Sequence, residues 1–229
     1  MAEVELRALD PEVSQFSQDA AQLGALVEKI CAELRVDHGK GLRALIQCLS
    51  EGYTFLFPAL RQLAQNGPEE ARRALVRAAA EAADPADPFR APFLLEILAP
   101  LLFDPIPEIR RAARRALRER LIPVYPEEAG EVLVQWAAEA DPSWKALAGQ
   151  MLGYLPQKWT RRALIALKHL AHSEEKNVRR AVVTALKRLL QQSPELVKAE
   201  LQRWLEDPAL SPLALRVLAG KEFPQSKVP

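Results

Sequence analysis

The sequence predicts an all-α protein made of stacked helix pairs, and three observations support this fold class. Apolar residues recur three and four positions apart along almost the whole chain, the spacing that gives a helix one apolar face. The 229 residues include only 9 glycines, and the 18 prolines fall mostly between the periodic segments, where prolines punctuate helices. Several helical segments also repeat at a nearly constant interval, which is typical of an α-α superhelix, or solenoid.

The periodicity predicts helices in nearly every part of the chain. Their expected ranges are 12–35, 39–50, 53–65, 68–83, 89–102, 106–121, 127–139, 142–154, 158–171, 175–191, 194–206 and 209–220. Asp104, Asp141 and Ser193 stand just before predicted helices, where a side-chain oxygen can cap free backbone N–H groups. Pro194 and Glu195 suit the first turn of the helix that follows Ser193.

The repeat is clearest in four segments: EARRALVRAAAEA, EIRRAARRALRER, SWKALAGQMLGYL and NVRRAVVTALKRL. Their apolar anchors, Ala71, Ile109, Trp144 and Val178, are separated by 38, 35 and 34 residues. A stacked two-helix unit of about this length gives about six pairs over the chain. We therefore expect one domain, with irregular N-terminal helices over 1–67, regular repeats over 68–221 and a tail over 222–229.

Composition indicates a soluble globular protein. Hydrophobic residues make up 49% and charged residues 27% of the chain, the net charge is +1, and no apolar run approaches the roughly 20 residues of a membrane helix. The N-terminal stretch MAEVELRALDPEV does not read as a secretion signal, so we expect a cytoplasmic protein. Cys31 and Cys48 are then expected as free thiols.

The segments DPIPEIRRAARRAL and EEKNVRRAVVTALKRL combine an acidic turn, a Val/Ile-Arg pair and spaced alanines. This pattern resembles the second helix of a HEAT repeat, over roughly 68–221. In the C-terminal half, YPEEAGEVLVQWAAEADPSW, SPELV and LSPLALRVLA resemble the bacterial alkylpurine DNA glycosylase family, including Trp136, Asp141 and Trp144. That resemblance implies a single HEAT-like domain related to DNA alkylation repair.

The resemblance also implies a catalytic Asp, with aromatic residues and an Arg nearby, but the chain departs from this pattern. The corresponding segment LLFDPIPEIRR has no tryptophan, Leu147 stands where the family has Arg, and Thr184 stands where it has Trp. Asp104 and Glu108 are the only carboxylates near the first gap, so they are weak catalytic candidates. Asp104 has a simpler expected role as a cap.

Other motifs are weaker candidates for function. His169 and His172 lie three residues apart without a third metal ligand at a recognisable spacing, so we expect a solvated helix end and no metal or cofactor site. The stretch HGKGL at 38–42 lacks the spacing of a phosphate loop and is interpreted as an interhelical turn. The four tryptophans, Trp136, Trp144, Trp159 and Trp204, are expected in the core, with Trp159 the best candidate for exposure.

The stretch IPEIRRAARRALRERL at 106–121 carries six arginines. Ile109, Ala112, Ala113, Ala116 and Leu117 form its expected apolar stripe, which leaves most arginines on the other side. Neighbouring repeats carry basic residues in register, so a basic column is expected along the concave groove. The candidate nucleic-acid-binding residues are Arg72, Arg73, Arg110, Arg111, Arg114, Arg115, Arg118, Lys145, Arg179, Arg180, Lys187 and Arg188.

Three functions remain open from the sequence. The first is non-catalytic binding of DNA or RNA through the basic groove, with DNA preferred. The second is a scaffold that holds an acidic protein or peptide, in which some arginines pair with the turn acids of neighbouring repeats. The third is a divergent alkylpurine DNA glycosylase that uses Asp104 or Glu108.

Overall fold

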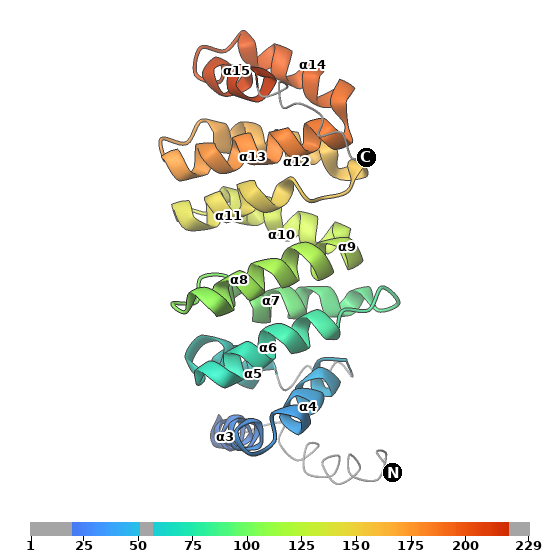
Figure 1. Cartoon of the computed structure of the whole chain (residues 1–229), viewed down its shortest axis with the longest axis vertical. Coiled ribbons are helices and arrows are strands. Elements are labelled where there is room, and N and C mark those ends of the chain that lie inside the picture. Colours follow the sequence, from blue (N-terminus) through green and yellow to red (C-terminus); the bar gives the residue numbers. More distant parts are fainter. Residues whose placement is uncertain (1–19, 51–56, 220–229) are drawn as a thin grey trace, which may run out of the picture. The chain divides into compact units, whose positions relative to one another are not determined.

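The computed structural model describes residues 20–50 and 57–219, and it shows the predicted all-α fold (Figure 1). In this part of the chain there is no strand, and the longer helices form six consecutive pairs. The pairs are α3 (Ala20–Val36) with α4 (His38–Ser50), α5 (Phe57–Asn66) with α6 (Glu69–Glu81), α7 (Ala91–Leu101) with α8 (Pro107–Ala116), α10 (Pro126–Ala138) with α11 (Pro142–Leu152), α12 (Thr160–Ala171) with α13 (Lys176–Gln192), and α14 (Pro194–Leu205) with α15 (Ser211–Ala219).

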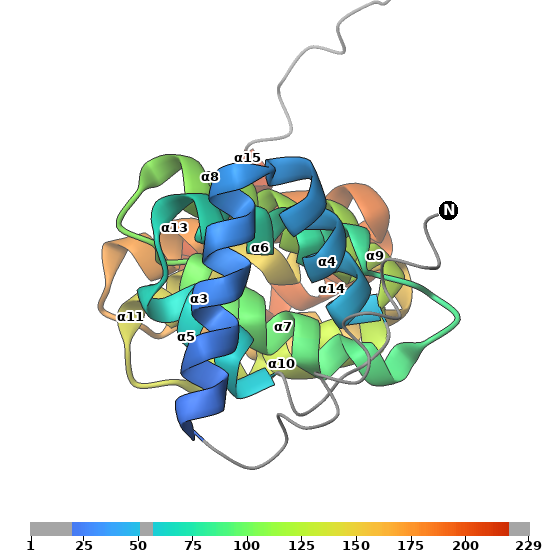
Figure 2. The same cartoon turned by 90° about the horizontal axis from the view of Figure 1, so that it is seen from below.

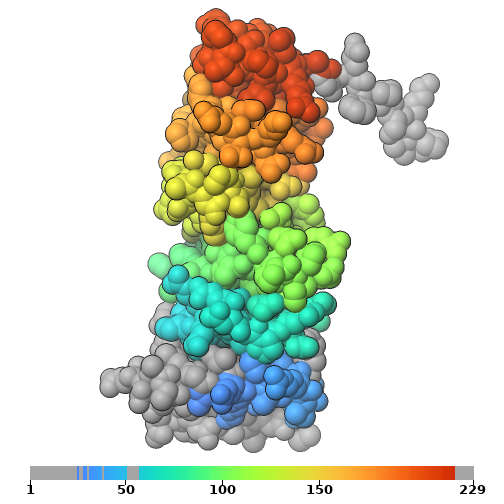
Figure 3. Space-filling view, turned by 90° about the vertical axis from the view of Figure 1, so that its left-hand side faces the viewer, coloured from blue at the N-terminus to red at the C-terminus, as the bar shows by residue number. Residues whose placement is uncertain are grey.

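The chain divides into two compact units, Met1–Val124 (unit 1) and Tyr125–Pro229 (unit 2). In each unit the first helices of the pairs pack on one another, and so do the second helices, giving two layers. Figure 2 shows α3 beside α4 in unit 1, and Figure 3 shows successive segments of each unit following one another in chain order. The predicted single domain, with irregular helices over 1–67, repeats over 68–221 and a tail over 222–229, includes both of these units. This organisation of the whole chain stays a prediction.

Close packing in unit 2 depends on two glycines of α11 and the turn after it. A Cβ atom built on Gly149 would lie 3.3 Å from the Ala181 Cβ, and one on Gly153 would lie 2.8 Å from the Ala185 Cα. Residues four apart lie on one helix face, so this glycine pair meets the alanine pair of α13. Small side chains on both sides let the two helix backbones approach closely and fix their register.

The predicted core position is confirmed for Trp159 and Trp204, including Trp159, which was the best candidate for exposure. Trp159 and Trp204 are 2% and 0% exposed. The Trp159 ring occupies the space beside Gly130, where a Cβ atom would lie only 2.7 Å from the ring. Trp136 and Trp144 were wrongly placed in the core, because they are half-buried; their rings contact each other at a centroid distance of 4.6 Å with an interplanar angle of 50°.

Helix boundaries agree closely with the predictions, with local exceptions. The predicted helix 106–121 ends its regular part at Ala116 and continues through a π-helical turn, η3 (Leu117–Leu121), into the short α9 (Ile122–Val124). Ala112 was wrongly placed in the apolar stripe, because it is exposed. The HGKGL stretch was wrongly assigned to a turn, because it forms the first turns of α4, where Asp37 accepts a hydrogen bond from the Lys40 N–H.

The predicted caps are correct at Asp141 and wrong at Asp104 and Ser193. Helix α8 has Ile106 as its N-cap and no side-chain cap, and Asp104 accepts from the Ile106 N–H in the turn before the helix. Asp141 accepts a hydrogen bond from the Ser143 N–H at 2.7 Å. The Ser193 hydroxyl does not cap α14 but is buried against Thr160, with 3.0 Å between the two hydroxyl oxygens. This buried pair ties the start of α12 to the start of α14 because each hydroxyl satisfies the other.

The remaining sequence expectations for membranes, thiols and metals can be compared with the described residues only. Cys31 and Cys48 are thiols that are not joined in a disulfide, as expected, and burial raises the pKa of the Cys31 thiol. None of the described helices combines the length and the apolar character needed to cross a membrane. His169 and His172 are exposed at the end of α12, and over residues 20–50 and 57–219 no cluster of three potential metal ligands occurs. The side chain of His38 and the predicted helical residues 12–19, 53–56 and 220 lie outside the described part.

Candidate nucleic-acid interface

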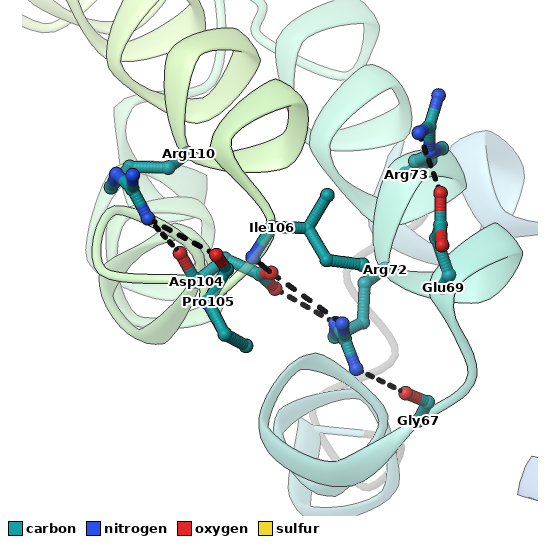
Figure 4. A network of polar contacts seen from close by, with 8 residues as sticks. All are labelled: Gly67, Glu69, Arg72, Arg73, Asp104, Pro105, Ile106 and Arg110. Carbon is teal, nitrogen blue, oxygen red and sulfur yellow. Dashed lines mark hydrogen bonds and ion pairs between the residues drawn. The ribbon is translucent and has the colours of Figure 1, made fainter.

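Asp104 lies in a polar network that joins two consecutive repeats of unit 1 (Figure 4). It is 3% exposed, and its Oδ2 lies 2.7 Å from Nε of Arg72 in α6. Its Oδ1 accepts a hydrogen bond from the Ile106 N–H at 2.8 Å. Arg72 also donates to the Gly67 carbonyl at 2.7 Å and is only 15% exposed. This weak catalytic candidate therefore holds the turn before α8 to the preceding repeat.

The arginine directly after the apolar anchor has the same local role in three repeats. Each such guanidinium turns back to main-chain carbonyl groups five or six residues earlier. The contacts are Arg72 to Gly67, Arg110 to Asp104 and Pro105, and Arg179 to Ser173 and Glu174, at 2.5–3.5 Å. These arginines stabilise the turns between helices, and this explains one basic residue per repeat without any ligand.

The other arginines of α8 and η3 are also largely engaged in unit 1. Two donate to distant carbonyl groups, Arg114 to Leu102 and Arg120 to Ala80, each at 3.2 Å. Two lie in ion pairs with neighbouring glutamates, Arg111 with Glu108 at 2.6 Å and Arg118 with Glu119. Partial burial, and then the positive charge of Arg110, lower the pKa of Arg114, in line with the expected repulsion between arginines four residues apart. Arg115 is exposed.

Glu108, the second weak catalytic candidate, is an exposed carboxylate in the first turn of α8. A hydrogen bond from its own backbone N–H, followed by the Arg111 guanidinium, lowers its pKa. A carboxylate kept ionised in this way stabilises the positive end of the helix dipole. Leu147, where the resemblance would place an Arg, is buried in the core of unit 2, so that position does not reach the surface.

Helix α13 in unit 2 carries a different surface. Its 17 residues contain five basic residues and no Asp or Glu. At 100° per residue, its solvent side presents only basic or neutral polar side chains. This surface, the α13 face, consists of Lys176, Asn177, Arg180, Thr184, Lys187, Arg188 and Gln191. Among the residues that the structure describes, no carboxylate lies in an ion pair with any of its cations.

Two details show how the α13 face is supported. The Arg188 guanidinium carbon lies 3.8 Å from the centroid of the Tyr154 ring, a cation–π contact that holds the side chain against the turn after α11. The Thr184 hydroxyl donates to the Arg180 carbonyl at 3.0 Å, so it remains on the helix surface between the cations. Thr184 is the position where the resemblance would place a Trp, and here it is exposed among basic residues.

The first-helix layers contain ion pairs that cross between repeats, unlike the α13 face. Arg61 of α5 pairs with Glu96 of α7 at 2.7 Å. In unit 2, α10 supplies the glutamates and the α12 region the cations, in the pairs Lys158–Glu127 at 2.5 Å and Arg162–Glu131 at 2.7 Å. Lys158 lowers the pKa of Glu127, chiefly through their hydrogen bond. These basic side chains are already partly neutralised by neighbours within the fold.

The predicted binding residues lie in both units. Some of them form hydrogen bonds or ion pairs within the fold, and others present their charge to solvent. Arg72, Arg110 and Arg179 hold turns, and the exposed Arg73 pairs with Glu69 at 2.5 Å. Lys145 of α11 is partly exposed, and Arg180, Lys187 and Arg188 lie together on α13. The expected basic column would run across both units, and it stays a prediction.

One groove in unit 2 was not anticipated from the sequence. It lies between α10 and α12, with a volume of about 520 Å³, and its lining is mostly apolar. Its lining includes Val134, Ala138 and Ile165, and the polar side chains in it are Glu131, Arg162 and His169. Helical periodicity assigns faces to single helices, but it does not show how far two neighbouring helices separate.

No protein-family model matches the chain, and no curated protein matches its sequence. Three crystal structures of engineered proteins from the Northeast Structural Genomics Consortium are similar to it. The first is 19% identical, with a TM-score of 0.40 over 84% of this chain and 95% of its own. The second is 18% identical, with a TM-score of 0.39 over 84% and 97%. The third is 18% identical, with a TM-score of 0.40 over 90% and 62%. We draw no function from these similarities.

Proposed function

We propose that the protein binds nucleic acid, with duplex DNA preferred, by contacting the phosphate backbone through the α13 face. The observation that carries this proposal is a continuous helix surface of cations and neutral donors without a single carboxylate. Arg and Lys contacts to phosphates give affinity and orientation without reading the base sequence. In this proposal, the protein is not a catalyst but binds nucleic acid by recognising its charged phosphate backbone.

The dimensions of the α13 face fit a row of phosphates. Lys176 and Lys187 are eleven residues apart, which corresponds to about 16 Å along a helix. One strand of B-DNA advances about 3.4 Å per phosphate along its axis, so the face spans roughly five phosphates. Thr184, Asn177 and Gln191 can add neutral hydrogen bonds between the charged contacts.

Unit 1 offers a weaker contribution. Helix α8 with η3 has six arginines against two glutamates, so it stays basic in spite of its internal contacts. However, Arg111 and Arg118 have carboxylate partners, and Arg110 and Arg114 donate to backbone carbonyls. Arg115 is the α8 arginine best suited for an additional phosphate contact, because it is exposed.

The test compares two triple variants with equal changes of charge. Lys176→Gln, Arg180→Gln and Lys187→Gln together remove three cations from the α13 face. The matched control, Lys168→Gln, Lys198→Gln and Arg203→Gln, removes two exposed cations and one half-buried cation from α12 and α14 of the same unit. Fluorescence anisotropy with a labelled duplex at ~50 mM salt should show binding that the first variant loses and the control retains. Equal losses in both variants would contradict the assignment to α13.

The same surface could hold an acidic protein segment, which was the second function open from the sequence. The α13 face favours any extended anion, because its cations lack carboxylate partners among the described residues. A polyglutamate competitor separates the two proposals. Displacement of the duplex only at large excess of polyglutamate supports the nucleic-acid proposal. Tighter binding of polyglutamate than of duplex at equal salt would replace it with the acidic-partner proposal.

A divergent glycosylase has less support. Asp104 is buried and engaged with Arg72 and the Ile106 N–H, and Glu108 is paired with Arg111 at the surface. Release of methylated purine from DNA, abolished by Glu108→Gln or Asp104→Asn in correctly folded protein, would be required to sustain that hypothesis.

A further inference from the structure

Arg188 is half-buried, and among the described residues no group of the protein accepts a hydrogen bond from it. Its Nη1 is buried and still has no partner. The other half-buried arginines of the described chain each donate to a main-chain carbonyl or pair with a carboxylate, namely Arg72, Arg90, Arg110, Arg114, Arg118 and Arg179. A charged donor withdrawn from water without an acceptor is costly, so the position of Arg188 calls for a reason other than folding.

The Tyr154 ring holds the Arg188 guanidinium in a fixed place. The guanidinium carbon lies 3.8 Å from the ring centroid, which puts the guanidinium directly over one face of the ring. Tyr154 reaches this position because Gly153 lets the turn after α11 approach α13, where a Cβ on Gly153 would lie 2.8 Å from the Ala185 Cα. Ala185 lies about one helical turn before Arg188. The arginine is therefore oriented before any ligand arrives, which lowers the entropy lost on binding.

The open edge of the Arg188 guanidinium fits an oxyanion. Since Nη1 is the nitrogen that is buried without a partner, Nε and Nη2 form the edge that a ligand can reach. These two nitrogens carry parallel N–H donors, the geometry that holds two oxygens of a phosphate or a carboxylate. A lysine at the same place offers charge without this pair of donors. Arg188 can therefore bind an anion by its shape as well as by its charge.

The surroundings of Arg188 favour a phosphate that belongs to a row of anions. Lys187 is its neighbour in sequence, and Arg180 lies two turns earlier, about 12 Å along the helix. Thr184 and Gln191, which lie on the same side of the helix, are neutral. Helix α13 has no carboxylate that would repel an anion here. A phosphate backbone reaches several of these cations at once, whereas a single carboxylate reaches one.

We infer that Arg188, positioned by Tyr154, is a bidentate contact for a phosphate group. The inference rests on the proposed nucleic-acid binding for the source of that phosphate, which is the duplex backbone. Arg188 binds the phosphate, and Tyr154 is a positioning residue that acts through Arg188. The contribution of this pair depends on the orientation of the guanidinium, so it is measured with variants that keep the charge of the chain.

Duplex binding by charge-conserving variants tests both roles. Arg188→Lys removes the pair of donors and Tyr154→Leu removes the ring, and each should weaken binding about 10-fold in fluorescence anisotropy at ~50 mM salt. Tyr154→Phe keeps the ring, and Arg180→Lys changes an exposed arginine of the same helix, so both should bind within about 2-fold of the unmodified chain. Circular dichroism checks that each variant is folded. Unchanged binding in Arg188→Lys or Tyr154→Leu, or an equal loss in Tyr154→Phe, would overturn the inference.

Inorganic phosphate gives a second measurement that does not depend on nucleic acid. In the chain labelled with ¹⁵N-arginine, the Arg188 Nε–H signal is assigned by its loss in Arg188→Lys. This signal should shift in a saturable way when phosphate replaces chloride at constant ionic strength, and the shift should persist in Tyr154→Phe and shrink in Tyr154→Leu. Acetate is the control for carboxylates. No response to phosphate, or an equal response to acetate, would overturn the assignment of phosphate.

The two measurements separate this inference from the proposed function. A chain that binds no duplex, but whose Arg188 signal responds to phosphate, would keep the Arg188 site and refute nucleic acid as its source of phosphate. A chain that binds duplex equally well in Arg188→Lys and Tyr154→Leu would keep the proposed function and refute the inference.

Discussion

Replacing Asp104 by asparagine removes one charge from the network that joins α6 to the turn before α8. The Asn side chain is nearly isosteric and its oxygen can still accept from the Ile106 N–H, which now lies 2.8 Å from Oδ1. What is lost is the negative partner of Arg72, whose Nε lies 2.7 Å from Oδ2. The substitution therefore isolates the ion pair from the turn.

The expected loss is large because both partners are shielded from water. The side chains of Arg72 and Asp104 are 15% and 2% exposed, so solvent screens their attraction weakly. Removing one partner of a buried ion pair typically costs about 3–5 kcal/mol, because the other charge remains buried without compensation. Arg72 keeps its hydrogen bond to the Gly67 carbonyl, which places the expected loss near the lower limit, at about 3 kcal/mol. Asp104→Ala should lose about 1 kcal/mol more, because it also removes the hydrogen-bond acceptor of the Ile106 N–H in the turn before α8.

Urea unfolding followed by circular dichroism measures these differences in the free energy of unfolding. Glu108→Gln is the matched control, since it removes a carboxylate from an exposed ion pair and from the first turn of α8, four residues away, and should cost less than about 1 kcal/mol. If Asp104→Asn unfolds within about 0.5 kcal/mol of the unmodified chain, the network does not stabilise the fold. The burial of Asp104 would then need a functional reason.

Three further predictions concern packing, turns and titration. Gly153→Ala should destabilise the chain by about 1–3 kcal/mol in urea unfolding, because its Cβ would meet the Ala185 Cα at 2.8 Å, whereas the exposed Gly39→Ala should not destabilise it. Arg179→Met should cost about 1–2 kcal/mol by losing its bonds to the Ser173 and Glu174 carbonyls, and equal losses in the neighbouring Arg180→Met would refute the distinction between turn and surface arginines. Lys158→Met should raise the pKa of Glu127 toward its ordinary value in an NMR titration. Because the pKa of Glu127 is lowered in the folded protein, the ionised Glu127 stabilises the fold above its ordinary pKa, and this stabilisation is lost as the pH falls through the lowered pKa. An unchanged pKa of Glu127 in Lys158→Met would show that Lys158 does not cause the lowering.

The fold could be predicted from the sequence because its signals are local. Apolar spacing and prolines locate the helices, and the anchors Ile109 and Val178 mark the repeat, since both are fully buried. The errors arose where a tertiary contact outweighs a local preference. Serine is a residue type that often caps helices, yet the Ser193 hydroxyl forms a hydrogen bond with Thr160 of a neighbouring helix. By contrast, the predicted burial of Trp159 is confirmed, because its ring fills the space that Gly130 leaves open.

The candidate interface could be predicted only in part. The six arginines at 106–121 suggested a binding surface, but most of them donate to carbonyls or pair with glutamates in the fold. The absence of acidic residues from 176–192 was visible in the sequence and is the signal that identifies the α13 face. The Arg72–Asp104 pair spans 32 residues, and the α10–α12 groove depends on helix separation, so no local pattern indicates either of them.

The salt dependence of duplex binding tests the central proposal most directly. The three cations Lys176, Arg180 and Lys187 predict a slope of about −3 for log K against log salt. Affinity should then fall ~60-fold between ~50 and ~200 mM salt, and the α13 triple variant should retain a slope no steeper than about −1. No duplex binding at ~50 mM salt, or a slope near −3 that persists in the triple variant, would contradict the proposal that the α13 face holds the phosphate backbone.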